Sequence, residues 1–174
     1  MKSYLEIQVP LRYDTQWFKT LREACKGIPV RWQNGYFHIT MAFLDETPSD
    51  VDFVPVISEQ LRTAIAPTLT FDKLDVFSTM SGDMYIVNLT CTNIPKTFED
   101  LVNKVRAEFE KQRAVIESDF RLHVTLGRIK DLTISQKEIE NILAGVVLPS
   151  FTLQLPDIQY RWFRGKAIGE WHLH

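Results

Sequence analysis

The sequence predicts an α+β fold with mostly antiparallel sheets. Stretches of helical and of strand periodicity are interleaved along the 174 residues, and several predicted strands follow one another in adjacent pairs. Strands joined by a short turn pair in antiparallel fashion, whereas a doubly wound parallel sheet needs a long crossover between successive strands. No low-complexity run or flexible linker divides the chain. The order of elements therefore favours an antiparallel architecture.

The first half is predicted to alternate strands with helices. Residues 4–9 carry apolar side chains at every second position, which is typical of a half-buried strand. Asp14 is a predicted N-cap, and apolar residues then recur at helical spacing until Gly27. A strand is predicted over about 36–44 and a second helix over about 52–66. The residues of this helix that are expected to face the core are Val54, Ile57, Leu61 and Ile65.

Two strands and a helix open the second half. The strands are predicted over about 68–77 and 84–91, and Ser78 to Asp83 form the turn between them. The helix is predicted to start near Pro95. The apolar face of this helix is expected to consist of Phe98, Leu101, Val105 and Phe109.

The last third of the chain is predicted to hold a strand, a helix and a pair of strands. Residues 120–129 have strand periodicity, and Ser135 to Glu138 match the capping box that begins a helix. Residues 151–174 are expected to form two strands around a turn at Arg164 and Gly165. The core-facing residues of the fourth helix are predicted to be Ile139, Ile142, Leu143 and Val146.

Composition disfavours several classes of protein. The chain has 22 acidic and 20 basic residues, a net charge of −2, which disfavours a protein that coats nucleic acid through many phosphate contacts. Cys25 and Cys91 lie far apart, so a structural zinc site and a disulfide scaffold are both disfavoured and a reducing compartment is expected. No apolar run reaches about 18 residues and no signal peptide is apparent, so we expect a cytoplasmic protein without a membrane span.

An internal repeat is the most informative feature. Residues 37–44 and 122–129 both fit the pattern apolar-His-apolar-Thr-apolar-small, and their histidines are 123 − 38 = 85 residues apart, close to half the chain. One such motif is most simply explained as a hydrogen-bonded strand histidine. Two motifs in matched context and half a chain apart predict two related lobes, each contributing one strand to a shared groove.

Strand geometry places the polar residues of each motif on one face. Since residues i and i+2 point to the same side of a strand, His38 projects with Thr40, and His123 with Thr125. The small residues Ala42 and Gly127 come next on these faces and are expected to leave room for a ligand. The opposite faces are apolar and are expected to bury against helices; they comprise Phe37, Ile39, Met41 and Phe43 in the first motif and Leu122, Val124 and Leu126 in the second.

These paired motifs resemble those of the two-histidine phosphoesterase superfamily, which includes 2′-5′ RNA ligase-like proteins and 2′,3′-cyclic nucleotide phosphodiesterases. The resemblance covers almost the whole chain, from the opening strand that ends at Pro10 to the C-terminal strands. It implies one bilobal domain over residues 1–174, with a pseudo-twofold axis. It also implies two sheets that line a central cleft, with the helices on the outside.

The resemblance further implies metal-independent chemistry on a phosphodiester, with no cofactor and a nucleotide or RNA end bearing a 2′,3′-cyclic phosphate as the substrate. The residues suit this chemistry, because imidazole exchanges protons near neutral pH and hydroxyl groups can donate to phosphate oxygens. By resemblance, His38 is the acid and His123 the base of hydrolysis, while Thr40 and Thr125 bind the substrate. Ligation of a 2′-hydroxyl onto a cyclic phosphate is the same reaction reversed. We expect a monomer that binds no metal.

Two departures leave substrate choice open. The first motif is followed by Asp45-Glu46, where family members often have Gly-Glu. Near the end of the final strand pair, where the family often carries a tyrosine, this chain has Lys166-Ala167-Ile168, with Trp171 further on. A non-catalytic module that binds RNA ends or nucleotides, and a phosphodiesterase for a cyclic phosphate metabolite other than RNA, therefore stay as alternatives.

Four further groups of residues were considered as site candidates. Arg128 is excluded because a regular strand points it away from the histidines. The polar face of the first strand has three candidates that the sequence does not rank, Tyr4, Glu6 and Gln8. Arg161 and Arg164 flank Trp162 and are predicted to be a solvated turn rather than an RNA-binding surface, and His172 and His174 a frayed tail rather than a metal site.

Overall fold

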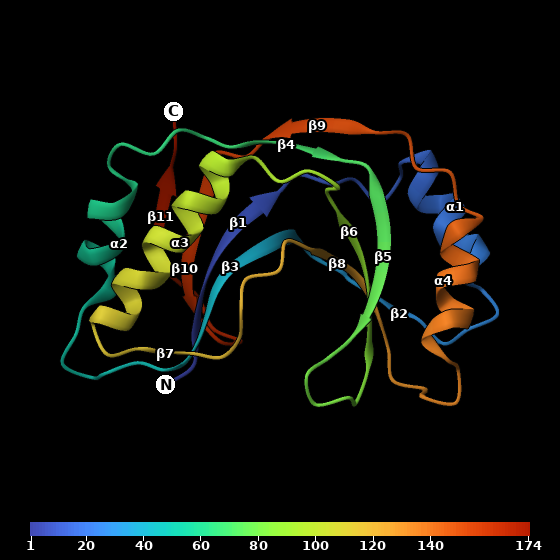
Figure 1. Cartoon of the computed structure of the whole chain (residues 1–174), viewed down its shortest axis with the longest axis horizontal. Helices are drawn as coiled ribbons and strands as arrows, with labels where there is room; N and C mark the ends of the chain where they lie inside the picture. The colour runs from blue at the N-terminus through green and yellow to red at the C-terminus, as the bar shows by residue number, and fades with distance from the viewer.

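The computed structural model describes all residues, 1–174, and has four helices and eleven strands (Figure 1). The helices are α1 (Gln16–Ala24), α2 (Phe53–Leu61), α3 (Lys96–Lys111) and α4 (Gln136–Ala144). The strands are β1 (Ser3–Val9), β2 (Arg31–Trp32), β3 (Phe37–Glu46), β4 (Thr68–Phe71), β5 (Lys73–Ser78), β6 (Tyr85–Thr90), β7 (Val115–Ile116), β8 (Val124–Ile129), β9 (Phe151–Gln154), β10 (Asp157–Trp162) and β11 (Ala167–His172). None of the helices is long and apolar enough to cross a membrane.

Nine strands form one sheet in the order β11-β10-β1-β3-β8-β6-β5, with β7 beside β3 and β2 beside β8. Every pair of neighbours is antiparallel. The remaining strands, β4 and β9, form a separate antiparallel pair. The predicted α+β class with antiparallel sheets is therefore confirmed, although the strands of the two motifs belong to one continuous sheet rather than to two.

The sheet consists of two halves that meet at a single residue pair. Strands β3 and β8 pair only at Ile39 and Val124; beyond this point β3 continues beside β7 and β8 beside β2. We call β11, β10, β1, β3 and β7 with helices α2 and α3 the His38 half, and β8, β6, β5 and β2 with helices α1 and α4 the His123 half. In Figure 1 they are the left and right sides of an arch. The pseudo-twofold axis itself stays a prediction.

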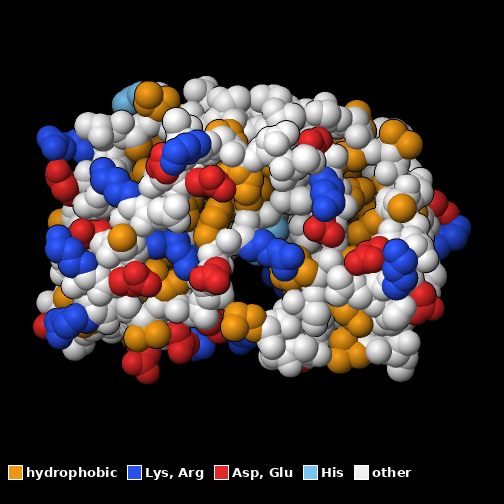
Figure 2. Space-filling view, in the orientation of Figure 1, with side chains coloured by type: hydrophobic (Ala, Val, Ile, Leu, Met, Phe, Trp, Pro, Cys, Tyr) orange, Lys and Arg blue, Asp and Glu red, His pale blue; other side chains and the backbone are white.

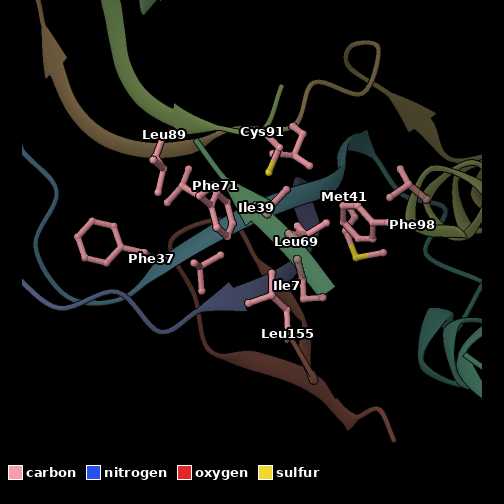
Figure 3. Packing of buried hydrophobic residues seen from close by; sticks show 14 of the residues in the cluster. Ile7, Phe37, Ile39, Met41, Leu69, Phe71, Leu89, Cys91, Phe98 and Leu155 are labelled. Carbon is pink, nitrogen blue, oxygen red and sulfur yellow. The ribbon is translucent and has the colours of Figure 1, made fainter. Parts of the chain in front are cut away.

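One face of the sheet is covered by the core. The helices cover the outer parts of the two halves, and the β4–β9 pair crosses between them at the top of Figure 1. Figure 3 shows Leu69 and Phe71 of β4 beside Ile39 at the centre of the sheet. These residues belong to a single cluster of 38 buried hydrophobic residues. The alternate side chains of β3 and β8, among them His38 and Thr125, consequently lie on the other face, and His123 directly precedes β8.

Both motif strands contain a β-bulge at equivalent positions. Along β3 the partners in β1 step from Ala42 to Thr40, so Met41 is unpaired; along β8 the partners in β6 step from Gly127 to Thr125, so Leu126 is unpaired. Positions 41 and 126 are 85 residues apart, like the histidines. A bulge inserts one extra residue and reverses which side chains face which side of the sheet.

The helices lie where the sequence predicts them, but two of their boundaries differ. The capping box at Ser135 is confirmed, with the Ser135 side chain accepting from Glu138 N–H and the Glu138 carboxylate accepting from Ser135 N–H. The N-cap of α1 is Thr15 and not Asp14, because Asp14 is held by the guanidinium of Arg12, 2.8 Å away. Helix α2 ends at Leu61, and Ile65 is 77% exposed rather than part of the core.

Three strand predictions need correction. The expected strand 68–77 is broken at Asp72, whose carboxylate accepts a hydrogen bond from Thr92 N–H at 2.7 Å; β4 therefore joins β9 while β5 joins β6. The strand predicted over 120–129 begins only at Val124, directly after the histidine. The tail has three strands rather than two, because β9 precedes the predicted pair β10 and β11.

Candidate functional site

The fold brings the two predicted histidines together. The residues that pair β3 with β8, Ile39 and Val124, each directly follow one of the histidines. Burial lowers the pKa of His38 to about 4, and the nearby His123 adds to this effect. Thr40 and Thr125 are half-buried on the same faces as their histidines, as the two-residue period of the strand predicts. All four predicted residues thus lie around the junction of the two halves.

A buried carboxylate lies beside His38. Glu6 is fully buried, and one of its oxygens, Oε2, is 3.6 Å from Nε2 of His38. The other oxygen accepts a hydrogen bond from the Tyr36 hydroxyl at 2.7 Å and lies 3.7 Å from the Arg161 guanidinium, which also contacts the Tyr36 hydroxyl. Burial raises the pKa of Glu6, whereas Tyr36 and Arg161 oppose this rise. We call Glu6, Tyr36 and Arg161 the Glu6 cluster.

The unpaired polar atoms of the protein gather in this place. The buried side-chain nitrogen and oxygen atoms without a hydrogen-bond partner are Glu6 Oε2, His38 Nδ1 and Arg161 Nε. Buried polar groups are nearly always paired, since an unpaired group loses its hydration without compensation. These three unpaired atoms lie together and do not stabilise the fold, which indicates that their polar groups serve binding or catalysis.

His123 is held differently. Its Nδ1 lies 2.9 Å from the carbonyl oxygen of Arg121, and because a carbonyl only accepts, Nδ1 carries the proton and Nε2 the lone pair. The edge of the ring packs against Phe77, with 5.0 Å between centroids, and the Arg121 guanidinium lies over the same phenyl ring. Burial lowers the pKa of His123, and the hydrogen bond to Arg121 partly offsets this. The imidazole is therefore oriented with a basic nitrogen free.

Arg128 lies on the same face as the histidines, contrary to the sequence prediction. The bulge at Leu126 reverses the alternation of β8, so Arg128 shares the face of His123, and its charge lowers the pKa of both histidines. Its Nη1 donates to Gln33 Oε1 at 2.7 Å, which fixes the guanidinium near the junction. The equivalent bulge in β3 turns Phe43 to the same side as His38, where it was expected in the core.

The two small residues of the motifs are both closely packed. Ala42 is 1% exposed, because the bulge moves it to the core side of β3. A Cβ atom on Gly127 would lie 2.5 Å from Val30 Cγ1 and 3.0 Å from Trp32, so only glycine lets β2 approach β8. The expectation that the small residue leaves room for a ligand is therefore wrong for Gly127, whereas Ala42 is among the residues that line the cavity beside His123.

A cavity of about 860 Å³ opens beside His123. Residues from both halves line it, including Thr40 and Phe43 of β3 and Phe77 of β5. Figure 2 shows the hollow between the two halves, with a histidine and several basic side chains at its edge. The charged residues of the lining are of both signs; they are Arg106, Arg121, Glu110, Glu117 and Asp119.

The other candidates from the sequence divide between the site and the surface. Arg161 is not part of a solvated turn, since it reaches Glu6, whereas Trp162 is 37% exposed and stacks toward the buried Tyr160. His172 makes an exposed contact of 2.8 Å with Asp157. No three His, Cys, Asp or Glu side chains are grouped so that they could hold a metal ion. Of the Glu6 cluster, the sequence offered Glu6 as one of three unranked candidates and assigned Arg161 to a solvated turn, and it gave no signal for Tyr36.

A comparison with known families places the chain in one of them. The model of the 2′-5′ RNA ligase superfamily matches residues 15–166. No curated protein sequence matches the chain significantly.

Solved structures resemble the fold over nearly the full length. E. coli LigT in complex with NADP+ has a TM-score of 0.61 at 17% identity, covering 99% of this chain and 97% of that one. E. coli LigT in complex with 3′-AMP has a TM-score of 0.61 at 18% identity, with 99% of both chains covered. Kluyveromyces marxianus Usb1 has a TM-score of 0.66 at 10% identity, covering 99% and 98%. At these identities the structures support the fold alone.

Proposed function

Because the chain belongs to the 2′-5′ RNA ligase superfamily, we propose that it is a phosphodiesterase for a 2′,3′-cyclic phosphate or a 2′-5′ linkage at the end of a nucleotide or RNA. The observation that carries this proposal is the junction of β3 and β8. There, the only two His-x-Thr motifs of the chain meet next to the only buried unpaired polar atoms. The bound nucleotides named for LigT and Usb1 support a nucleotide as the ligand class.

His123 is the base in this proposal. Its Nε2 has a free lone pair because Nδ1–H donates to Arg121, and its lowered pKa keeps the ring neutral at neutral pH. In hydrolysis, Nε2 takes a proton from water as the water oxygen attacks phosphorus. The new P–O bond forms while the bond from phosphorus to one ribose oxygen breaks, so the cyclic diester becomes a monoester.

His38 is the acid that protonates the departing ribose oxygen. The carboxylate of Glu6, 3.6 Å away, favours the imidazolium form that this role requires. In the free protein the pKa of His38, about 4, leaves the ring neutral. An anionic phosphate between the histidines opposes this lowering, so substrate binding loads the proton that catalysis uses.

The remaining residues bind the phosphate. The Arg128 guanidinium, held by Gln33, supplies the positive charge, and the hydroxyl groups of Thr40 and Thr125 donate to the non-bridging oxygens. These donors stabilise the charge that collects on those oxygens in the transition state. The reverse reaction, attack of a 2′-hydroxyl on the cyclic phosphate, uses the same groups and gives a 2′-5′ linkage. We also propose that the chain acts as one monomeric domain in the cytoplasm without a metal.

Incubation with 2′,3′-cyclic mononucleotides and 2′-5′ linked dinucleotides in the presence of EDTA tests the function. We expect turnover by the wild type and a loss of roughly 10²–10⁴-fold in kcat for His38→Ala and for His123→Ala. Binding of nucleotide without turnover would favour the non-catalytic alternative. Turnover that requires a metal, or that survives both substitutions, would overturn the mechanism.

A further inference from the structure

A row of aromatic rings leads away from His38 along the sheet. Tyr4 stacks on His38 with 6.1 Å between ring centroids, and Phe43 stacks on Tyr4 at 6.1 Å with an interplanar angle of 10°. Phe163, in the turn after β10, meets Phe43 edge to face at 5.8 Å. The three rings Tyr4, Phe43 and Phe163, which we call the aromatic row, thus connect the site with the outer end of the His38 half.

The aromatic row shares a surface with the site. Tyr4 and Phe43 are cross-strand partners in β1 and β3, on the same side as the pair formed by Gln8 and His38. Phe43 also lines the cavity beside His123, together with Thr40. Core packing does not account for the end of the row, because Phe163 is 46% exposed.

Each ring of the row has a cation above it. The Lys2 ammonium lies 5.8 Å from the centre of Phe43, the Arg161 guanidinium 5.9 Å from Tyr4, and the Arg164 guanidinium 5.1 Å from Phe163. Three acidic groups face two of these cations: Asp45 pairs with Lys2 at 2.5 Å, Glu117 lies near enough to raise the pKa of Lys2, and Glu6 lies 3.7 Å from Arg161. The charges beside Phe43 and Tyr4 are therefore balanced within the protein, whereas Arg164, beside Phe163, makes no salt bridge.

Flat rings with cations beside them suit single-stranded nucleic acid. Bases stack on aromatic side chains whatever their identity, while Lys and Arg contact the phosphates between them. A protein partner or a lipid surface would favour an apolar patch without such a regular succession of ring and cation. The row starts at His38, so a strand bound there would end with its reactive phosphate between the histidines.

We propose that the aromatic row is a track for the nucleotides upstream of the reactive phosphate, and that the substrate is a single-stranded oligoribonucleotide rather than a mononucleotide. The proposal rests on the proposed function for its catalytic part. The terminal nucleotide occupies the cavity at the histidines. The next bases stack on Phe43 and Phe163, and their phosphates meet Lys2 and Arg164.

The test compares oligoadenylates of one, two and three nucleotides that end in a 2′,3′-cyclic phosphate. For the wild type we expect kcat/KM to rise about tenfold from the mononucleotide to the trinucleotide, since stacking of a base on an aromatic ring contributes roughly a factor of 5 to 150. Phe163→Ala is expected to remove most of this gain in kcat/KM from the mononucleotide to the trinucleotide. Val147→Ala, which truncates an 82% exposed residue after α4, is the matched control and should keep the ratio.

A second variant tests the charges. Lys2→Gln combined with Arg164→Asn removes two cations, and asparagine tolerates the positive φ of 57° at position 164. We expect the salt dependence of trinucleotide binding to weaken by a slope of about 0.7 per cation lost. Binding is measured by fluorescence anisotropy with labelled oligoadenylates ending in a 3′-phosphate, which are not turned over. Thermal melting verifies that each variant is folded.

The outcomes separate the two proposals. If the mononucleotide is hydrolysed but the trinucleotide is no better, or if Phe163→Ala lowers both by the same factor, the track is refuted and the phosphodiesterase stands. If nothing is hydrolysed but anisotropy shows an affinity that grows with length and depends on Phe163, the track stands and the catalytic function fails. Equal affinity for all lengths would refute the track whatever the catalytic result.

Discussion

The two halves of the molecule present the same motif in different surroundings. Each has a histidine, a threonine two residues later and a β-bulge one residue after that. Past the bulge the His38 half exposes the ring of Phe43, whereas the His123 half exposes the cation of Arg128. His38 lies beside the carboxylate of Glu6, and His123 is bonded to a backbone carbonyl. The repeated backbone positions the two imidazoles, and their unlike neighbours give them different electrostatic surroundings.

A substrate whose leaving group needs no proton is expected to separate the roles of the two histidines most strongly. A nucleoside phosphodiester with a p-nitrophenyl leaving group departs without a proton, so it requires the base but not the acid. We expect His123→Ala to lose roughly 10³-fold in kcat/KM on this substrate, and His38→Ala to lose less than about tenfold. Release of p-nitrophenolate gives the rates. Equal losses for the two variants would contradict the assignment of acid and base.

Arg128 is the next largest expected difference between the halves. Arg128→Ala removes a half-buried guanidinium on the histidine face, and a hydrogen bond to a charged group contributes about 2 kcal/mol, which corresponds to a roughly thirtyfold loss in kcat/KM on a cyclic mononucleotide. Arg31→Ala, which removes an exposed cation from the neighbouring strand β2, is the control for net charge. A loss within twofold for Arg128→Ala would remove Arg128 from the site.

The free energy of unfolding is expected to depend on pH through the burial of the His38 and His123 rings. The pKa of His38 is about 4 in the folded protein, below the ordinary value near 6.5 of an unfolded chain. Between these two pH values the folded state therefore binds fewer protons than the unfolded state. Stability is therefore fully present above about pH 6.5 and decreases below it. We expect wild type to lose about 2 kcal/mol more than His38→Gln between about pH 7 and about pH 5.

Urea unfolding at the two pH values measures this difference. We expect the loss of stability between the two pH values to differ less between wild type and His123→Gln than between wild type and His38→Gln. The reason is that the hydrogen bond to Arg121 offsets part of the lowering of the pKa of His123. Parallel losses in wild type and His38→Gln would mean that the His38 ring is not neutral in the folded protein.

The smallest expected effect concerns Glu6. Glu6→Gln keeps the shape of the cluster but removes the charge beside His38, so the pKa of His38 in the substrate complex should fall. We expect the alkaline limb of the profile of kcat against pH to move to lower pH, with roughly a tenfold loss near neutral pH. His123-dependent steps are unaffected, so the p-nitrophenyl substrate serves as the control. A tenfold loss without a shift of the profile would indicate a structural role only.

Much of the fold is local information and could be predicted. The alternation of β1 and β3, the capping box at Ser135 and the apolar faces of the helices are all set by neighbours within a few residues. Long-range pairing was harder. Residues 68–78 have continuous strand character in the sequence. Only the hydrogen bond from Thr92 N–H to the Asp72 carboxylate shows where the strand is interrupted, so that β4 and β5 belong to different sheets.

The candidate site was predicted where it depends on the two-residue period and missed where that period is interrupted. His38 and Thr40 precede the bulge at Met41, as His123 and Thr125 precede the one at Leu126, so their common faces followed from the spacing. Phe43 and Arg128 come after the bulges and were assigned to the wrong sides. The Glu6 cluster joins residues 6, 36 and 161, whose proximity no local pattern expresses.

The sequence by itself determined the class of fold, the family and the four motif residues. The class of fold depends on periodicity and the motif residues on the internal repeat, while the family was identified by the resemblance of that repeat to known motifs. Only the tertiary structure decided which charges surround the histidines, because a bulge is selected by the register of the partner strand and a buried cluster by the packing of distant segments. For that reason the shared motif was readable from the sequence, and the difference between the two histidines was not.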